Sequence, residues 1–143
     1  MKQTKLRGFS LLELLITIVI LSVITTIAVN SYQASVRKAR RADAKADLME
    51  LAQLLERNYT ETNSFATDIS GNAVALAYNV SPQQGNVVFY NLAFAAGFPT
   101  PISYVIVASP AGPQNNDTRC MNLTLDHTGT KGISGSGSVA ECW

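Results

Sequence analysis

The pattern of apolar and polar positions divides the first part of the chain into two kinds of helical sequence. From residue 9 to residue 29 most positions are apolar, and Glu13 is the single charged residue. A helix over this stretch reaches roughly 30 Å, enough to cross the hydrocarbon core of a bilayer. The pattern therefore predicts a membrane-spanning helix with one carboxylate inside it, and such a carboxylate costs about 2.5–3.5 kcal/mol on insertion scales.

The residues after this run continue the helix with a different surface. Neither Pro nor Gly occurs between Gly8 and Gly71, and strong helix formers dominate as far as about Glu61. Apolar residues recur there at spacings of three and four, which places them on one face. They are Ala44, Leu48, Leu51, Ala52, Leu55 and Tyr59. We expect one helix from Phe9 to about Glu61, apolar all round in its first half and amphipathic in its second.

The polar face of the second half carries two like-charge pairs at a spacing of i, i+4. Arg41 stands with Lys45, and Asp43 stands with Asp47. Each pair is mildly unfavourable on an isolated helix. Neighbouring copies of the chain could neutralise them; the alternative is a solvated face on which Arg40 and Asp43 partly compensate one another.

From Asn63 onward the pattern changes to turns and short strands. Residues 86–94 and 103–109 are β-branched and aromatic, and residues 120–126 alternate apolar with polar side chains. These segments predict three antiparallel strands, and residues 130–133 are a candidate fourth. Strands that follow one helix imply an α+β fold with the sheet laid on the helix. The Gly- and Ser-rich end of the chain would be loose without a tether at Cys142.

Composition limits the chemistry. The 11 basic and 10 acidic residues give a net charge of +1, which does not suggest a protein that coats nucleic acid. The two cysteines, Cys120 and Cys142, form no Cys-x-x-Cys pair, and His127 is the one histidine, so we expect no metal site and no cofactor. The two cysteines have a simpler interpretation. If the soluble part lies outside the cytoplasmic membrane, they are most simply one disulfide. Closing its loop of about 23 residues would stabilise the fold by roughly 3 kcal/mol. Two free thiols are the alternative.

The amino terminus differs from an ordinary secretory signal. It has a basic start, but the apolar run is longer than 7–15 residues and lacks an Ala-x-Ala-like exit, so we expect the mature protein to keep it. Positive charges flank the run on both sides, and charge alone does not orient it. The expected disulfide and the short leader favour a cytoplasmic amino terminus.

The stretch RGFSLLELL resembles the start of the type IV pilins. It combines a short basic leader that ends at Gly8, an aromatic Phe9, and Glu13 at the fifth position after the leader. Residues 31–65 resemble the minor pilins of the PilE kind. The resemblance implies the type IV pilin fold, with one long N-terminal helix, half of it transmembrane, packed on a small antiparallel sheet. It divides the chain into a leader (1–8), a transmembrane and filament-core half of the helix (9–29) and a periplasmic or extracellular head (30–143), with the amphipathic half of the helix at about 30–61.

The same resemblance implies the site residues. A prepilin peptidase would cut between Gly8 and Phe9 and methylate the new amino group of Phe9. Glu13 would pair with that amine on a neighbouring subunit, so that its buried charge is compensated only on assembly. The alternative is that Glu13 lies near enough to the cytoplasmic face to snorkel or become protonated. Cys120 and Cys142 stand where pilins carry their disulfide-bounded region. The implied partners are other pilin subunits, the peptidase and the inner-membrane assembly machinery.

Two positions depart from the pattern of many main-subunit pilins. Ser22 and Asn30 stand where those proteins place a mid-span Gly and a later Pro. We therefore predict a helix that melts less readily in a filament. The departure favours a minor over a main subunit.

The sequence favours a minor pilin that helps to start pilus assembly and enters the fibre, in twitching motility or adhesion. Before assembly it would lie in the inner membrane, where the basic residues 37–41 could contact anionic lipid; afterwards it would lie in the surface pilus. A major pilin and a type II secretion pseudopilin are alternatives, although the carboxy-terminal disulfide and the lack of an Asp-rich calcium loop disfavour the main pseudopilin.

Two other classes are disfavoured. A DNA-uptake pilin would need exposed Lys and Arg with aromatics on its tip, yet after Arg57 only Arg119 and Lys131 remain, so nucleic acid is not an expected partner. An enzyme is not expected either. Asp126 and His127 are adjacent, and adjacent side chains on a strand point to opposite faces.

Overall fold

The computed structural model describes residues 9–143. Its first element is the helix α1 (Leu11–Thr62), which has 52 residues, close to the helix expected from residue 9 to about 61. The remaining elements are β1 (Val80–Ser81), β2 (Tyr90–Phe94), β3 (Val105–Pro110), the 3-10 helix η1 (Gly112–Asn116), β4 (Leu123–Asp126), β5 (Lys131–Ile133) and α2 (Val139–Cys142). The chain divides into two units, one that ends at Val36 and one from Arg37 to Trp143. We call the second unit the head.

The helix continues without interruption through the two positions that depart from the pilin pattern. The Ser22 hydroxyl donates to the Val19 carbonyl at 2.7 Å, and the Asn30 side-chain amide donates to the Thr26 carbonyl at 3.2 Å. Each of these two polar side chains therefore donates a hydrogen bond to the backbone of the helix itself. The lower tendency to melt in a filament stays a prediction.

The five strands form one antiparallel meander in the order β1-β2-β3-β4-β5. Chain neighbours are sheet neighbours, with Leu92 opposite Ala108 and Ile106 opposite Leu125. The expectation of three strands with a candidate fourth was too low. It missed β1, because two residues are too few to show an alternating pattern.

The predicted strands were also longer than the observed ones. The strand expected from residue 120 begins at Leu123, because Met121 has a positive φ of 51°, a left-handed conformation that does not continue a strand. The strand expected from residue 86 begins at Tyr90, five residues after Gly85, whose φ is also positive.

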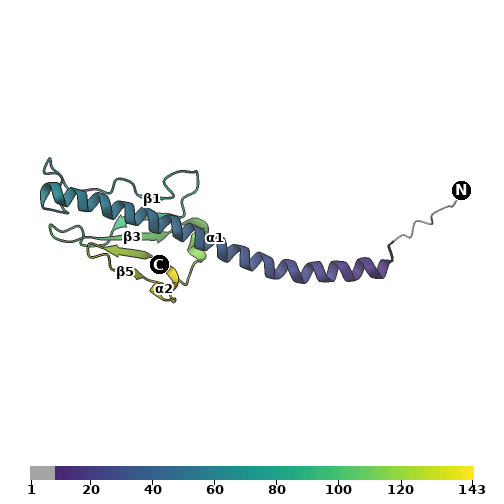
Figure 1. Ribbon diagram of the computed structural model, residues 1–143. Coiled ribbons are helices and arrows are strands. Elements are labelled where there is room, and N and C mark those ends of the chain that lie inside the picture. The colour runs from purple at the N-terminus through teal and green to yellow at the C-terminus, as the bar shows by residue number, and fades with distance from the viewer. Residues whose placement is uncertain (1–8) are drawn as a thin grey trace. The chain divides into compact units, whose positions relative to one another are not determined.

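The core of the head lies between α1 and the sheet. The predicted stripe is buried at Ala44, Leu48, Leu51 and Leu55. It packs against buried side chains of the sheet and its loops, namely Phe65, Tyr90, Leu92, Tyr104, Ile106, Ala108, Leu123 and Leu125. Figure 1 shows the strands lying along the teal part of α1. This arrangement confirms the α+β fold, with the second half of a long helix packed on an antiparallel sheet.

The Gly- and Ser-rich end of the chain is held at several points. Ser138 and Glu141 form a capping box at the start of α2, in which each side chain bonds the backbone of the other. The indole N–H of Trp143 donates to the Gly132 carbonyl of β5 at 3.0 Å. These contacts fix the carboxy-terminal residues against the edge strand.

Candidate assembly surface and charged flanks of the head

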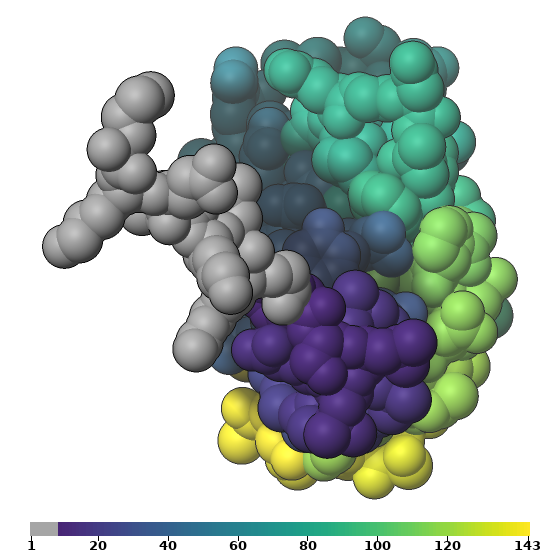
Figure 2. All heavy atoms as spheres, turned by 90° about the vertical axis from the view of Figure 1, so that its right-hand side faces the viewer, coloured from purple at the N-terminus to yellow at the C-terminus, as the bar shows by residue number. Residues whose placement is uncertain are grey.

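The first half of α1 exposes its apolar side chains all round. Leu11 is 81% exposed and Ile27 is 69% exposed, at opposite ends of the apolar run. Figure 2 shows the start of this helix end on, in purple. By length and composition the helix has a stretch able to cross a membrane. Since isolated apolar surface of this extent is unfavourable in water, lipid or other protein must cover it.

The residues predicted for processing and assembly lie at the start of this helix. Gly8 lies outside the described residues. Phe9 is largely exposed, and Glu13 is an exposed residue in the first turn of α1. Within residues 9–143, the Glu13 carboxylate forms no ion pair. The described residues therefore leave this carboxylate available to a cation from outside them.

A buried polar network ties the head end of α1 to η1. Arg41 donates to the Asp117 carboxylate at 2.7 Å, and only 4% of the Asp117 side chain is exposed. The fully buried Gln114 amide donates to Asp117 at 3.1 Å and to the Tyr90 hydroxyl at 3.0 Å. Burial raises the pKa of Tyr90 to about 12. Because each charged member of the network has a partner, the ion pair and the hydrogen bonds offset part of the desolvation cost of burying these groups.

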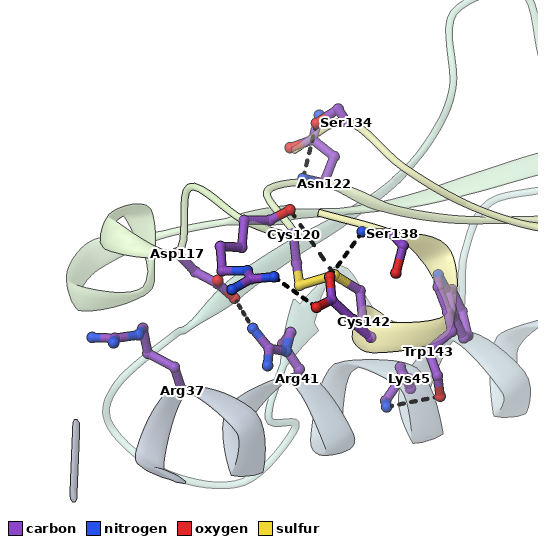
Figure 3. The surroundings of a disulfide bond; sticks show 12 residues. Arg37, Arg41, Lys45, Asp117, Cys120, Asn122, Ser134, Ser138, Cys142 and Trp143 are labelled. Atoms are coloured by element: carbon purple, nitrogen blue, oxygen red, sulfur yellow. Dashed lines mark hydrogen bonds and ion pairs between the residues drawn. A yellow bond between two sulfur atoms is a disulfide. The ribbon is translucent and has the colours of Figure 1, made fainter. Parts of the chain in front are cut away.

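The carboxy terminus lies beside the same part of α1. Cys120 and Cys142 are joined by a disulfide with an S–S distance of 2.01 Å, and both are buried. The Lys45 ammonium donates to the Trp143 carbonyl at 3.2 Å. Figure 3 shows Arg41 and Lys45 pointing from α1 towards Asp117 and Trp143, on either side of the disulfide. The head thus brings together residues that are about a hundred positions apart in the sequence.

One flank of α1 in the head is basic. Lys38, Arg41 and Lys45 lie at spacings of three and four and so share one face. From the sheet, Lys131 of β5 joins them, with its ammonium 5.2 Å from the centre of the Trp143 ring. Burial lowers the pKa of Lys45, and the charges of Arg41, Lys131 and Lys38 lower it further. We call Lys38, Arg41, Lys45 and Lys131 the basic flank.

The other flank is acidic. Asp43, Asp47 and Glu50 lie at spacings of four and three, and residues on either side of β1 reach Asp47 and Glu50. The Gln83 amide donates to Asp47 at 3.0 Å and to Glu50 at 3.1 Å. The Tyr78 hydroxyl donates to the Asp47 carbonyl at 3.1 Å, and burial together with the charges of Glu50 and Asp47 raises the pKa of Tyr78. We call Asp43, Asp47 and Glu50 the acidic flank.

Sequence patterns indicated these flanks only in part. The pairs Arg41–Lys45 and Asp43–Asp47 stood out as like-charge neighbours on a helix. Lys131 could not be added from the sequence, because the topology of the sheet and the path of the carboxy terminus bring it to the basic side. In the same way, Gln83 reaches the acidic side through a loop whose course has no sequence signature.

Comparison with known proteins identifies the family. Residues 30–124, about two thirds of the chain, match the family model described as "Type IV minor pilin ComP, DNA uptake sequence receptor". The chain belongs to this family of type IV minor pilins. Residues 4–29 match the prokaryotic N-terminal methylation motif. The resemblance to the type IV pilin family, stated from RGFSLLELL, is thereby confirmed, and this pilin belongs to a structural rather than an enzymatic family.

Two solved structures are similar to this pilin. The non-core minor pilin PilV of Neisseria meningitidis is 23% identical, with a TM-score of 0.49, over 73% of this chain and 92% of that chain. A type IV pilin from Shewanella oneidensis is 24% identical, with a TM-score of 0.41, over 66% of this chain and 89% of that chain. No curated protein matches the chain.

Proposed function

We propose that this minor pilin is stored in the inner membrane through residues 9–29, with its amino terminus in the cytoplasm, and then moves into a pilus fibre and helps to start its assembly. One contrast supports this: the head buries its own core, whereas the first half of α1 leaves its apolar surface exposed. A helix that is apolar all round and uncovered needs lipid before assembly and neighbouring helices afterwards. Twitching motility and adhesion are the cellular processes that we expect such a fibre to serve.

The proposal gives each residue at the amino terminus a role. Cleavage between Gly8 and Phe9 removes the basic leader, and methylation modifies the new amine of Phe9. The cationic amine of one subunit then pairs with the Glu13 carboxylate of its neighbour. A buried carboxylate is costly alone and tolerable when paired, so this contact can set the register between helices.

The test has a genetic and a chemical part. Deleting the gene should abolish or sharply reduce surface fibres, and the pilin should be a trace component of sheared wild-type fibres. Mass spectrometry of the fibre-borne chain should find a methylated Phe9 at its amino terminus. Normal fibres after deletion would contradict the role in starting assembly, and a mature chain that begins elsewhere would contradict the processing.

A second candidate function is capture of DNA for uptake. The matched family model is described as a DNA uptake sequence receptor. In support, the basic flank joins Lys38 and Lys45 of α1 to Lys131 of β5, beside the aromatic Trp143. Cations next to an aromatic ring suit a nucleic-acid backbone and its bases. Counting only the basic residues after Arg57 underestimated this patch, because most of it comes from the helix.

DNA binding is tested with the full-length pilin in detergent and short DNA duplexes. Lys38→Ala with Lys131→Ala should weaken binding and reduce the slope of log affinity against log salt by about 0.9 for each phosphate that the variant no longer neutralises. Arg57→Ala removes an exposed cation that is paired with Glu61 and should leave the slope unchanged. Equal binding by the wild-type and double-variant chains would contradict this second candidate.

A further inference from the structure

The sheet has an uncovered edge beyond the short strand β1. β1 pairs with only two residues of β2, Tyr90 and Asn91. β2 continues to Phe94, and on the side that faces away from β3 the Leu92 N–H donates to the Asn79 carbonyl at 2.8 Å. Past this bond, no described segment is hydrogen-bonded to that side of β2. The end of β2 is therefore an edge, although the strand lies second in the sheet.

The register of β2 with β3 shows which backbone groups are free on this edge. The Ala95 N–H donates to the Val105 carbonyl at 2.9 Å, and partners in an antiparallel pair bond at every second residue. Ala93 therefore bonds to β3, whereas Phe94 directs its N–H and C=O away from β3. The Leu92 carbonyl points to the same side as Phe94. Within the described part of the chain, the edge thus offers a carbonyl, an N–H and a second carbonyl in a row.

A second unpaired stretch of backbone faces this edge. In residues 74–79, partly buried side chains alternate with exposed ones, as they do along a strand. Among residues 9–143, the backbone of residues 75–78 has no hydrogen bond to another backbone group. A groove of about 460 Å³ lies between this stretch and β2, lined by residues 75–79 and 92–94. Each wall of the groove therefore has peptide groups without a backbone partner.

We propose that this groove binds an extended, uncharged peptide segment of another protein, which pairs with β2 as an added strand. Every lining residue is uncharged, so the groove has no counter-charge for an ion, a nucleic acid or a charged segment. The N–H and C=O groups of a strand recur at every second residue and match the free groups of Leu92 and Phe94. The small side chains of Ala75, Ala77 and Ala93 leave room for those of the added strand.

The groove is separate from the surfaces that the proposed functions use. It contains no residue of the apolar half of α1, and it lies beside β1, at the other end of the strand order from β5 and Lys131. Loss of peptide binding would therefore leave fibre assembly and DNA binding intact, and failure of either proposed function would leave the groove intact.

The experiment uses the full-length pilin in detergent and a synthetic peptide of alternating Thr and Val residues with blocked ends. Amide hydrogen exchange, followed by NMR, compares two neighbouring residues of β2. We expect the Phe94 N–H to exchange rapidly in the free pilin and to slow by about tenfold or more at high peptide concentration, because the added strand accepts its hydrogen bond. The Ala93 N–H, already bonded to β3, should keep its rate.

Two controls isolate the backbone pairing. The same peptide with N-methyl groups on alternate amides keeps its side chains but loses the hydrogen bonds of one edge, and it should leave Phe94 unchanged. In the pilin, Ala77→Asp puts a charge on the wall of the groove and should abolish the slowing at the same peptide concentration, since charged residues on an edge oppose strand addition. Ala46→Asp adds the same charge at an exposed position of α1 outside the groove and should bind like the wild type.

Each other outcome overturns the proposal. Unchanged exchange of Phe94 at high peptide concentration would show that the edge does not accept a strand. Equal slowing by the N-methylated peptide would show that side chains alone are bound. Slow exchange without peptide would show that the groove is already filled: by a second copy of the pilin if the rate depends on pilin concentration, and by the chain's own residues 75–78 if it does not.

Discussion

Leu12 and Leu48 are the same residue type in the same helix, yet 67% of Leu12 is exposed and Leu48 is wholly buried. The difference lies in what the rest of the chain supplies. In the head, the sheet covers the apolar stripe of α1. In the unit that ends at Val36, the large apolar side chains of the helix are exposed, and no described segment of that unit covers them. The head therefore buries its own apolar core, whereas the apolar surface of the first half of the helix needs a bilayer or other subunits to cover it.

Substitution of the two leucines should show the largest difference. Leu48→Ala should lower the free energy of unfolding of the head by about 4 kcal/mol, because it removes buried methyl groups and leaves a cavity. Leu12→Ala should leave it unchanged. Urea denaturation of the full chain in mild detergent measures both, and equal losses would contradict the division into a self-sufficient head and an uncovered helix.

Loss of the disulfide should have the next largest effect, again confined to the head. Replacing Cys120 and Cys142 by Ala removes a cross-link over a sequence separation of 22, and the expected loss is about 3 kcal/mol. Insertion of residues 9–29 into the membrane should be unaffected. The measurements are denaturation with and without reductant and the recovery of the variant in membranes; a head of unchanged stability would show that the other contacts of α2 suffice.

Breaking the buried ion pair should cost less. Arg41→Ala leaves the Asp117 carboxylate buried with Gln114 as its remaining side-chain donor, and the expected loss is about 2 kcal/mol. Arg57→Ala is the matched control, because its pair with Glu61 is exposed, and it should change stability by less than about 1 kcal/mol. Similar results for the two variants would mean that the network does not hold η1 to α1.

The smallest expected effect is a dependence on alkaline pH. Burial raises the pKa of Tyr90 to about 12, above the value near 10 of an exposed tyrosine. A raised pKa in the folded state means that the stabilisation is complete below about pH 10 and is lost as the pH rises through about 12. Urea midpoints along this range should fall more steeply for the wild type than for Tyr90→Phe. Parallel curves would contradict the assigned burial of the phenol.

The sequence predicted what depends on neighbours along the chain. The long helix, its apolar stripe and the candidate strands follow from periodicity, and RGFSLLELL indicated the family. The missed features depend on distant residues or on single backbone angles. Strand β1 is too short to show alternation, the positive φ of Met121 shortens β4, and Lys131 joins the basic flank only through the sheet. The role of Glu13 also lies beyond a single chain, since its expected partner is another subunit.

The central claim is that the uncovered half of α1 serves assembly through Glu13, and the most direct measurement is the share of Glu13→Val that reaches the fibre. Thr17→Val is the control, because it also replaces a polar residue of the same helix, one whose hydroxyl bonds its own backbone at Leu14. We expect both variants at wild-type levels in the membrane. In sheared fibres, Thr17→Val should match the wild type and Glu13→Val should fall by about tenfold or more, which corresponds to the loss of a pairing worth at least about 1.4 kcal/mol. Incorporation of Glu13→Val at the wild-type level would contradict the account.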